Sequence, residues 1–145
     1  MLIDKQNYYL DIACAVSRRA PCLKKQYGAV IVNNDRICST GYNGPPSKEP
    51  HCTQCTKGST DHDINEYSCC PSVHAEMNAI IMASKEEMLG ADLYLAGFDV
   101  KTNAFIAAEP CQICLRLIKN AGINRVYNKN GLIYERKSGV LIKCH

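Results

Sequence analysis

The chain has 145 residues, of which 46% are hydrophobic, and a formal net charge of +3 at pH 7. This length and apolar content predict a single folded domain over residues 1–145 and exclude a mainly disordered chain. No apolar run reaches the roughly 18 residues of a membrane span, and so small a charge does not by itself indicate nucleic acid. The opening residues lack the pattern of a secretion signal, so we expect a cytoplasmic protein.

The first half of the chain predicts a helix, a hairpin and a long polar segment. Apolar residues recur at helical spacing before Pro21, with Asp4 available as the N-cap. Residues 28–32 and 36–40 predict two strands that a short Asn-Asn-Asp turn would join. Residues 47–71 are polar, and so long a loop in a compact domain indicates a function or a bound metal.

Helices and strands alternate in the second half. Residues 74–88 predict the clearest helix, and residues 110–120 predict another with Pro110 at its first position. Strands are expected at 91–98 and 104–108, with weaker candidates at 124–127 and 140–143. This alternation after an initial hairpin predicts an α/β sandwich with a partly antiparallel sheet.

Ten cysteines are the unusual feature of the composition. A disulfide framework is typical of small secreted domains, whereas this chain can build an ordinary core and shows no export signal. In a reducing compartment, cysteines are expected to be metal ligands or small buried residues. We interpret Cys14, Cys38 and Cys144 as structural.

Two short segments together predict a zinc site. Cys111 and Cys114 lie three residues apart at the start of a helix, where their thiols share one face and the helix dipole favours thiolates. His74 adds an imidazole at the start of the other helix. Three protein ligands leave the fourth position of a zinc ion open, as in catalytic sites, and zinc lowers the pKa of a water there to about 7.

Glu76 lies two residues after His74, where its carboxylate can take a proton from the water and return it to a leaving group. Alone, C-x-x-C could be a redox pair or half of a zinc ribbon, and H-x-E occurs by chance in many helices. Their conjunction, with H-x-E opening one helix and P-C-x-x-C opening the next, is the known signature of zinc-dependent base deaminases.

At these residues the sequence resembles the deoxycytidylate (dCMP) deaminase branch of the zinc-dependent cytidine deaminase superfamily. Three further segments carry the resemblance, namely Y-G-A-V-I-V at 27–32, S-T-G-Y-N-G-P-P at 39–46 and V-H-A-E-M-N-A-I at 73–80. The resemblance covers residues 10–127. It implies a cytidine deaminase-like three-layer α/β/α sandwich with a mixed five-stranded sheet.

The resemblance also implies the reaction, in which dCMP is hydrolysed to dUMP with release of ammonia, supplying dUMP for thymidylate synthesis. Glu76 would protonate ring N3 and then the amine, Asn43 would bind the sugar, and the backbone around Val73 and Ala75 would read the pyrimidine edge. The implied zinc ligands are His74, Cys111 and Cys114. Family members are commonly oligomers, often hexamers, and some respond to dCTP and dTTP. From the residues alone, Asn43 between two glycines is better explained as a turn asparagine.

Further ligand-type residues surround the long polar segment. Some dCMP deaminases carry a second, structural zinc, and the resemblance places its ligands at Cys22, Cys52 and Cys70. Such an ion would explain how a segment with few apolar residues stays ordered, and the alternative is a set of free thiols. The fourth ligand is open among Cys55, Cys69, His51 and His62.

A nucleotide monophosphate requires a cation or a helix N-terminus near the mouth of its pocket. Lys85 lies three turns along the helix that His74 opens and is one candidate for the phosphate contact. The other candidates are Lys24, Lys25 and Lys48. Each of these lysines, taken singly, could be an ordinary solvated side chain.

Two other functions stay open from the sequence. A deaminase of this kind could act on cytidine, guanine or a base within nucleic acid, although two Phe, no Trp and the weak net charge argue against a nucleic-acid groove. A non-catalytic zinc-binding interaction module is the other alternative. Glu76 argues against it, because a purely structural site has no use for a proton carrier beside an open coordination position.

Overall fold

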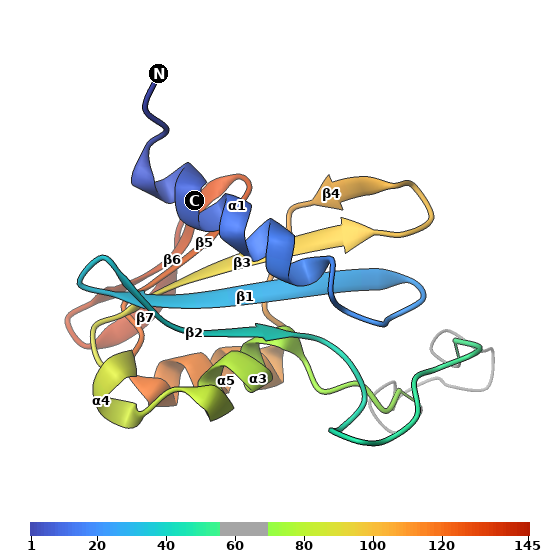
Figure 1. Cartoon of the computed structure of the whole chain (residues 1–145). Coiled ribbons are helices and arrows are strands. Elements are labelled where there is room, and N and C mark those ends of the chain that lie inside the picture. The colour runs from blue at the N-terminus through green and yellow to red at the C-terminus, as the bar shows by residue number, and fades with distance from the viewer. Residues whose placement is uncertain (56–69) are drawn as a thin grey trace.

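The computed structural model describes residues 1–55 and 70–145 and shows helices and strands in alternation (Figure 1). Its helices are α1 (Lys5–Ser17), α3 (Ala75–Met82), α4 (Lys85–Met88) and α5 (Gln112–Ala121). Its strands are β1 (Lys25–Asn33), β2 (Arg36–Tyr42), β3 (Asp92–Asp99), β4 (Ala104–Ile106), β5 (Arg125–Asn128), β6 (Gly131–Lys137) and β7 (Val140–Lys143). None of the helices described is long and apolar enough to cross a membrane.

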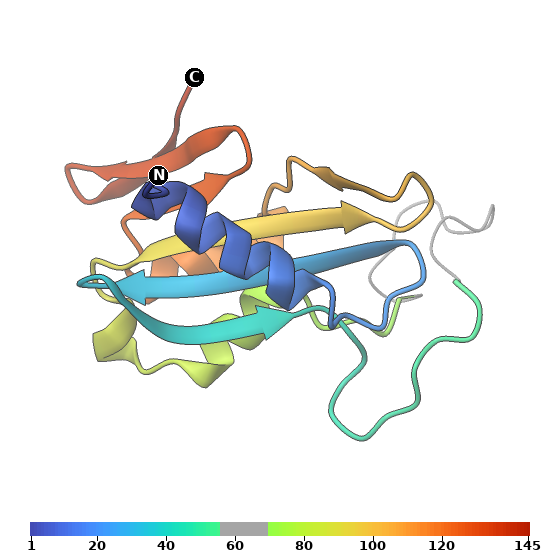
Figure 2. The same ribbon diagram turned by 45° about the horizontal axis from the view of Figure 1, so that its top comes forward.

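The strands form one mixed sheet in the order β2-β1-β3-β5-β6-β7, with β4 paired to the outer end of β3. β1 is antiparallel to both β2 and β3, whereas β3 and β5 are parallel. Helix α1 crosses one face of the sheet, and α3, α4 and α5 cover the other (Figures 1 and 2). This arrangement confirms the predicted α/β/α sandwich, with seven strands in the described part of the chain instead of five.

The sequence patterns did not reveal β6, which continues the sheet beyond β5. Two-residue turns join this strand to both of its neighbours. In the second of these turns, Ser138 and Gly139 have φ angles of 50° and 81°, as in the hairpin turns that follow the twist of a sheet. Asn130-Gly131 and Ser138-Gly139 are turn dipeptides, so the signal for this hairpin was present in the sequence.

The helix expected over residues 74–88 is in fact two helices. The interruption follows from a capping box, in which the Ser84 hydroxyl accepts from the Glu87 N–H at 3.1 Å and Glu87 Oε1 accepts from the Ser84 N–H at 2.8 Å. This pair starts a new helix at Lys85. The expectation of one continuous helix was therefore wrong in its second half.

The other two predicted helices are confirmed, with one correction at a boundary. Asp4 caps α1 by accepting from the Asn7 N–H at 2.8 Å. Cys111 is the N-cap of α5, so Pro110 lies before the helix and not at its first position. The helix ends at Gly122, whose φ of 87° is the left-handed conformation that favours glycine.

Two apolar clusters fill the spaces between the layers, one on each face of the sheet. On β1, Ala29 and Ile31 face α3 and α5, whereas Val30 and Val32 face α1. β3 alternates in the same way, with its odd-numbered residues toward α3 and α5. Odd positions of these two strands therefore lie on the face that carries the predicted zinc ligands.

Candidate active site

The three predicted zinc ligands meet where α3 and α5 begin. His74 is the N-cap of α3, Cys111 is the N-cap of α5, and Cys114 lies in the first turn of α5. His74 Nδ1 lies 3.5 Å from the Cys111 sulfur and 3.3 Å from the Cys114 sulfur. The three ligand atoms lie within 4.8 Å of one another, and no other such group of three occurs within residues 1–55 and 70–145.

The chemistry of this group fits zinc. Two thiol sulfurs and one imidazole nitrogen are donors that zinc takes, and three donors leave one position for a water or a substrate. Burial raises the pKa of the Cys114 thiol, and the negative charges of Glu76 and Cys111 raise it further. A divalent cation would offset this cost by placing positive charge among the sulfurs.

Glu76 is a buried carboxyl in the first turn of α3, with only 5% of its surface exposed. Burial raises the pKa of this carboxyl, while hydrogen bonds with its own backbone N–H and with Cys114 act in the opposite direction. The carboxyl therefore lies against one of the ligands. A buried carboxyl in this position is suited to hold a proton and to release it during a reaction.

Asn43 follows β2 and is fixed to the backbone of β1. Its Oδ1 accepts from the Tyr27 N–H at 2.7 Å, and its Nδ2 donates to the Lys25 carbonyl at 3.0 Å. The side chain is buried, with 6% exposed. A primary amide has two N–H groups, and one of them is used on the Lys25 carbonyl.

The two predicted base-reading positions differ in what their backbones offer. Val73 donates to the Gly44 carbonyl at 2.7 Å and accepts from the Gly44 N–H at 3.1 Å. This bridge ties the loop after β2 to the residue before His74 and engages both backbone groups of Val73. Ala75 is fully buried at the start of α3, where the N–H groups of the first turn have no acceptor within the helix.

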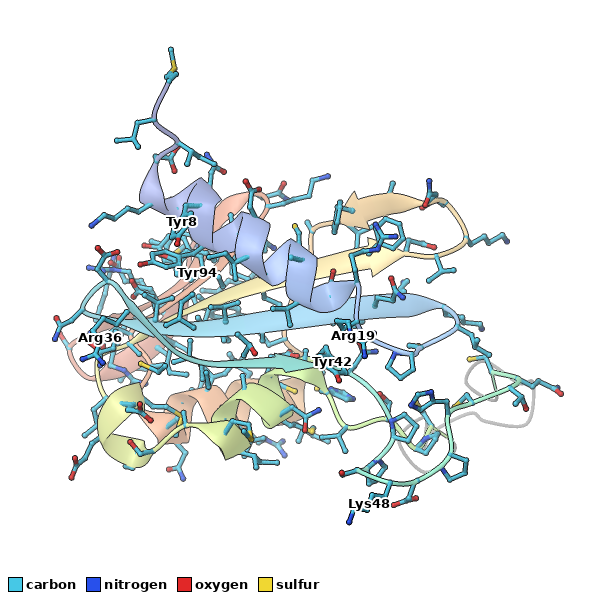
Figure 3. All side chains as sticks on the ribbon, in the orientation of Figure 1. Tyr8, Arg19, Arg36, Tyr42, Lys48 and Tyr94 are labelled. Atoms are coloured by element: carbon cyan, nitrogen blue, oxygen red, sulfur yellow. The ribbon has the colours of Figure 1, made fainter. Side chains whose placement is uncertain are left out.

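Lys85 lies far from the ligand group. Its Nζ donates to the carbonyl of Asn120, near the C-terminal end of α5, whereas Cys111 caps the other end of that helix. This position does not support a phosphate contact at Lys85. Lys48 extends from the loop after β2 away from the sheet (Figure 3). Lys25 is exposed at the start of β1, where its carbonyl already holds Asn43.

The predicted second metal site is a pocket lined by thiols. It is lined by prolines and by the half-buried side chains of four cysteines, namely Cys22, Cys52, Cys55 and Cys70. No three of these sulfurs lie within 4.8 Å of one another in the described structure. His51 is exposed and does not line the pocket. Cys69 and His62 lie outside the described residues.

Tyr27 is a neighbour of this site to which no sequence pattern assigned a role. It is bonded to Asn43 through its backbone and packs on the core beneath α3 and α5. Its position in β1, two residues after Lys25 and two before the buried Ala29, would have placed it on the same face as both. The alternation of side chains along a strand was thus the signal that could have found it.

Comparisons with known proteins give a consistent result. A relative is the deoxycytidylate deaminase of Mycobacterium phage D29, 35% identical over 85% of this chain and 92% of that protein. Another, from Schizosaccharomyces pombe, is 30% identical over 83% of this chain but only 35% of its own length. The dCMP deaminase of cyanophage S-TIM5, solved in apo form, is 26% identical with a TM-score of 0.64 over 88% of this chain and 84% of that one. The same enzyme in complex with dCMP and dUMP gives a TM-score of 0.60 at 25% identity, over 88% of this chain and 82% of that one.

The family profile described as the cytidine and deoxycytidylate deaminase zinc-binding region matches residues 3–129. This match spans most of the chain and includes both segments that meet at the candidate site. Together with the D29 relative, it establishes that the chain belongs to the cytidine and deoxycytidylate deaminase family.

Proposed function

We propose that this protein is a zinc-dependent hydrolase that converts dCMP to dUMP and ammonia. The observation that carries the proposal is the meeting of His74, Cys111 and Cys114 beside the buried carboxyl of Glu76. The names of the relatives, deoxycytidylate deaminase in phage and yeast, support dCMP as the substrate. The complex of the S-TIM5 enzyme with dCMP and dUMP supports the same substrate and product.

His74, Cys111 and Cys114 would hold the zinc ion, which supplies a Lewis acid that makes water a nucleophile at neutral pH. The water oxygen bonds to C4 of the cytosine ring, the bond from C4 to the exocyclic nitrogen breaks, and ammonia leaves. Glu76 takes the proton that the water gives up and passes it to ring N3. It then takes the second proton of that water from the new C4 hydroxyl and delivers it to the amine, so that ammonia leaves and C4 becomes a carbonyl.

The substrate is bound by side-chain and backbone groups next to the zinc ligands. Asn43 donates its remaining amide N–H to the sugar, and the Ala75 N–H at the start of α3 donates to the pyrimidine edge. The carbonyl of Val73 keeps a second lone pair for the base, although Gly44 occupies the first. Lys25 is the lysine best placed for the phosphate, because its backbone adjoins Asn43 and strand alternation directs its side chain to the same face as Tyr27.

The thiol-lined pocket is proposed as a structural zinc site with Cys22, Cys52, Cys70 and Cys55 as its ligands. Cys22 precedes β1 and Cys70 precedes His74, while Pro45 of the loop after β2 lines the same pocket. A metal there would join three segments that border the active site. The sulfurs would have to approach one another more closely than they do in this structure.

Exposed apolar side chains on the outer helix layer support assembly of several copies. Ile81 and Met82 at the end of α3 are 71% and 72% exposed, and Leu89, Ile113 and Leu117 add to this surface. The resemblance to the dCMP branch favours six copies and control by dCTP and dTTP. A cytoplasmic location agrees with the number of thiol ligands, because the cytosol keeps thiols reduced.

The substrate is tested by ammonia release from dCMP, CMP, deoxycytidine, cytosine and guanine, each with and without added dCTP. We expect the highest kcat/KM with dCMP. A higher value for the free nucleoside or for guanine would exclude dCMP deamination as the function. Ammonia from none of the five, with zinc bound, would instead favour the non-catalytic alternative.

Glu76→Gln is expected to lower kcat by at least about 10²–10⁴-fold, because the variant cannot carry protons between water and base. Zinc content and melting temperature should stay at the wild-type level. Glu86→Gln, an exposed residue of α4, is the matched control and should behave as wild type. Undiminished ammonia release by the Glu76 variant at equal zinc content would refute its role.

Metal content separates the two proposed zinc sites. Wild-type protein should hold two zinc ions per chain by elemental analysis, and His74→Ala and Cys52→Ser should each hold one. The His74 variant loses turnover, whereas the Cys52 variant keeps the active-site ion. Cys38→Ser should change neither the zinc content nor the turnover. A single ion in the wild type, lost in the His74 variant and retained in the Cys52 variant, would rule out the second site.

Lys25→Ala is expected to raise KM for dCMP about tenfold, the effect of losing one hydrogen bond to a charged group. KM for deoxycytidine, which has no phosphate, should not change. Lys85→Ala is the matched control and should leave both values unchanged, since its ammonium is bonded to Asn120. An equal rise for both substrates in the Lys25 variant would show a loss unrelated to the phosphate.

A further inference from the structure

Tyr27 is the second of four residues in a row that begins just after β2 and crosses β1, β3 and β4. Asn43, following β2, donates its N–H to the Tyr27 carbonyl at 3.4 Å. Tyr27 of β1 is the register partner of Gly97 on β3, and Gly97 is in turn the partner of Ile106 on β4. The row therefore runs from the proposed sugar-binding amide across the sheet, with Tyr27 next to that amide.

The side chain of Tyr27 lies on the same face of the sheet as the zinc ligands. Odd-numbered positions of β1 and β3 face α3 and α5, and Tyr27 packs against the apolar cluster on that face. Burial raises the pKa of the Tyr27 phenol, and the charge of Glu76 is the next largest cause. The hydroxyl of Tyr27 therefore stays protonated at neutral pH.

The Tyr27 ring occupies space that Gly97 leaves open. A Cβ at Gly97 would lie 3.0 Å from Cε1 and 3.1 Å from Cδ1 of the ring, and 3.0 Å from Ile106 Cγ1. The ring therefore lies across the glycine, beside Ile106. Two hydrogen bonds to Asn43 fix the backbone of Tyr27 at the same time. The ring is half-buried.

We propose that Tyr27 is a substrate-contacting residue, beside Asn43 on the face of the sheet that carries Glu76 and the zinc ligands. This inference rests on the proposed deaminase function. Asn43 would hold the sugar and Glu76 would serve the base, so the Tyr27 ring, beside Asn43 on the same face, packs against the nucleotide. Its hydroxyl, which can both donate and accept, makes one hydrogen bond to the nucleotide and fixes the angle between sugar and base.

Tyr27→Phe and Tyr27→Leu test the two parts of this contact. Phenylalanine keeps the ring over Gly97 and removes only the hydroxyl, so we expect the Kd of dUMP by calorimetry to rise about 3–10-fold. KM for dCMP should rise by a similar factor with little change in kcat, because the bond is made in both the ground and transition states. Leucine also removes the ring face and should weaken dUMP binding further.

Tyr42→Phe is the matched control, because Tyr42 lies at the same end of the sheet on β2 and is 40% exposed (Figure 3). It should bind dUMP as the wild type does. Zinc content and melting temperature, measured for every variant, distinguish a lost contact from a damaged fold. Folded Tyr27→Phe and Tyr27→Leu proteins that bind dUMP with the wild-type Kd would overturn the inference.

The wild-type protein tests the proposed function separately from the Tyr27 variants. If it binds zinc but releases no ammonia from dCMP, the proposed function fails. The Tyr27 variants are then compared on the panel substrate that the wild type does deaminate. A raised KM there supports the contact for the new substrate. An unchanged KM in both variants overturns it.

Discussion

The site depends on one constraint, which is that two helices begin side by side at the same end of the sheet. His74 and Cys111 are the N-caps of α3 and α5, and Glu76 and Cys114 follow in the first turns. Both helix dipoles favour negative charge there, each by roughly 0.3–2 kcal/mol. Burial works against this effect and prevails at Cys114 and Glu76, whose pKa values are raised. A cation is what reconciles two thiolates and a carboxyl in so confined a space, which is why these residues together fit a metal centre.

Strand β2 sets the position of α3 and therefore of His74. A Cβ at Gly41 would lie 2.4 Å from both the Ala75 carbonyl oxygen and the Ala79 nitrogen, so only glycine allows this approach. The Ser39 hydroxyl donates to the Ala79 carbonyl at 2.7 Å, and Asn78 donates to the Tyr42 carbonyl at 2.8 Å. Gly41 thus has a packing role that is distinct from the ligand contact proposed for Asn43 in the same S-T-G-Y-N-G segment.

The metal-ligand group could be predicted from the sequence because its members occupy helix starts, and the spacing of H-x-E and P-C-x-x-C identifies those starts. The position of Lys85 has a different origin. Counting turns from His74 to Lys85 assumes one straight helix, whereas the Ser84 capping box breaks it and the lysine reaches the end of α5. Similarly, the amide of Asn43 finds its partners on β1, 16 and 18 residues earlier, a pairing that local spacing does not encode.

The loop after β2 is where these separate features act on one another. Asn43 fastens it to β1, Gly44 pairs with Val73 directly before the first ligand, and Pro45 lines the thiol pocket. Three consecutive residues are thereby attached to three different parts of the site. Because ordering a backbone costs roughly 1–2 kcal/mol per residue, a loop already fixed in this way need not be ordered again when a nucleotide binds.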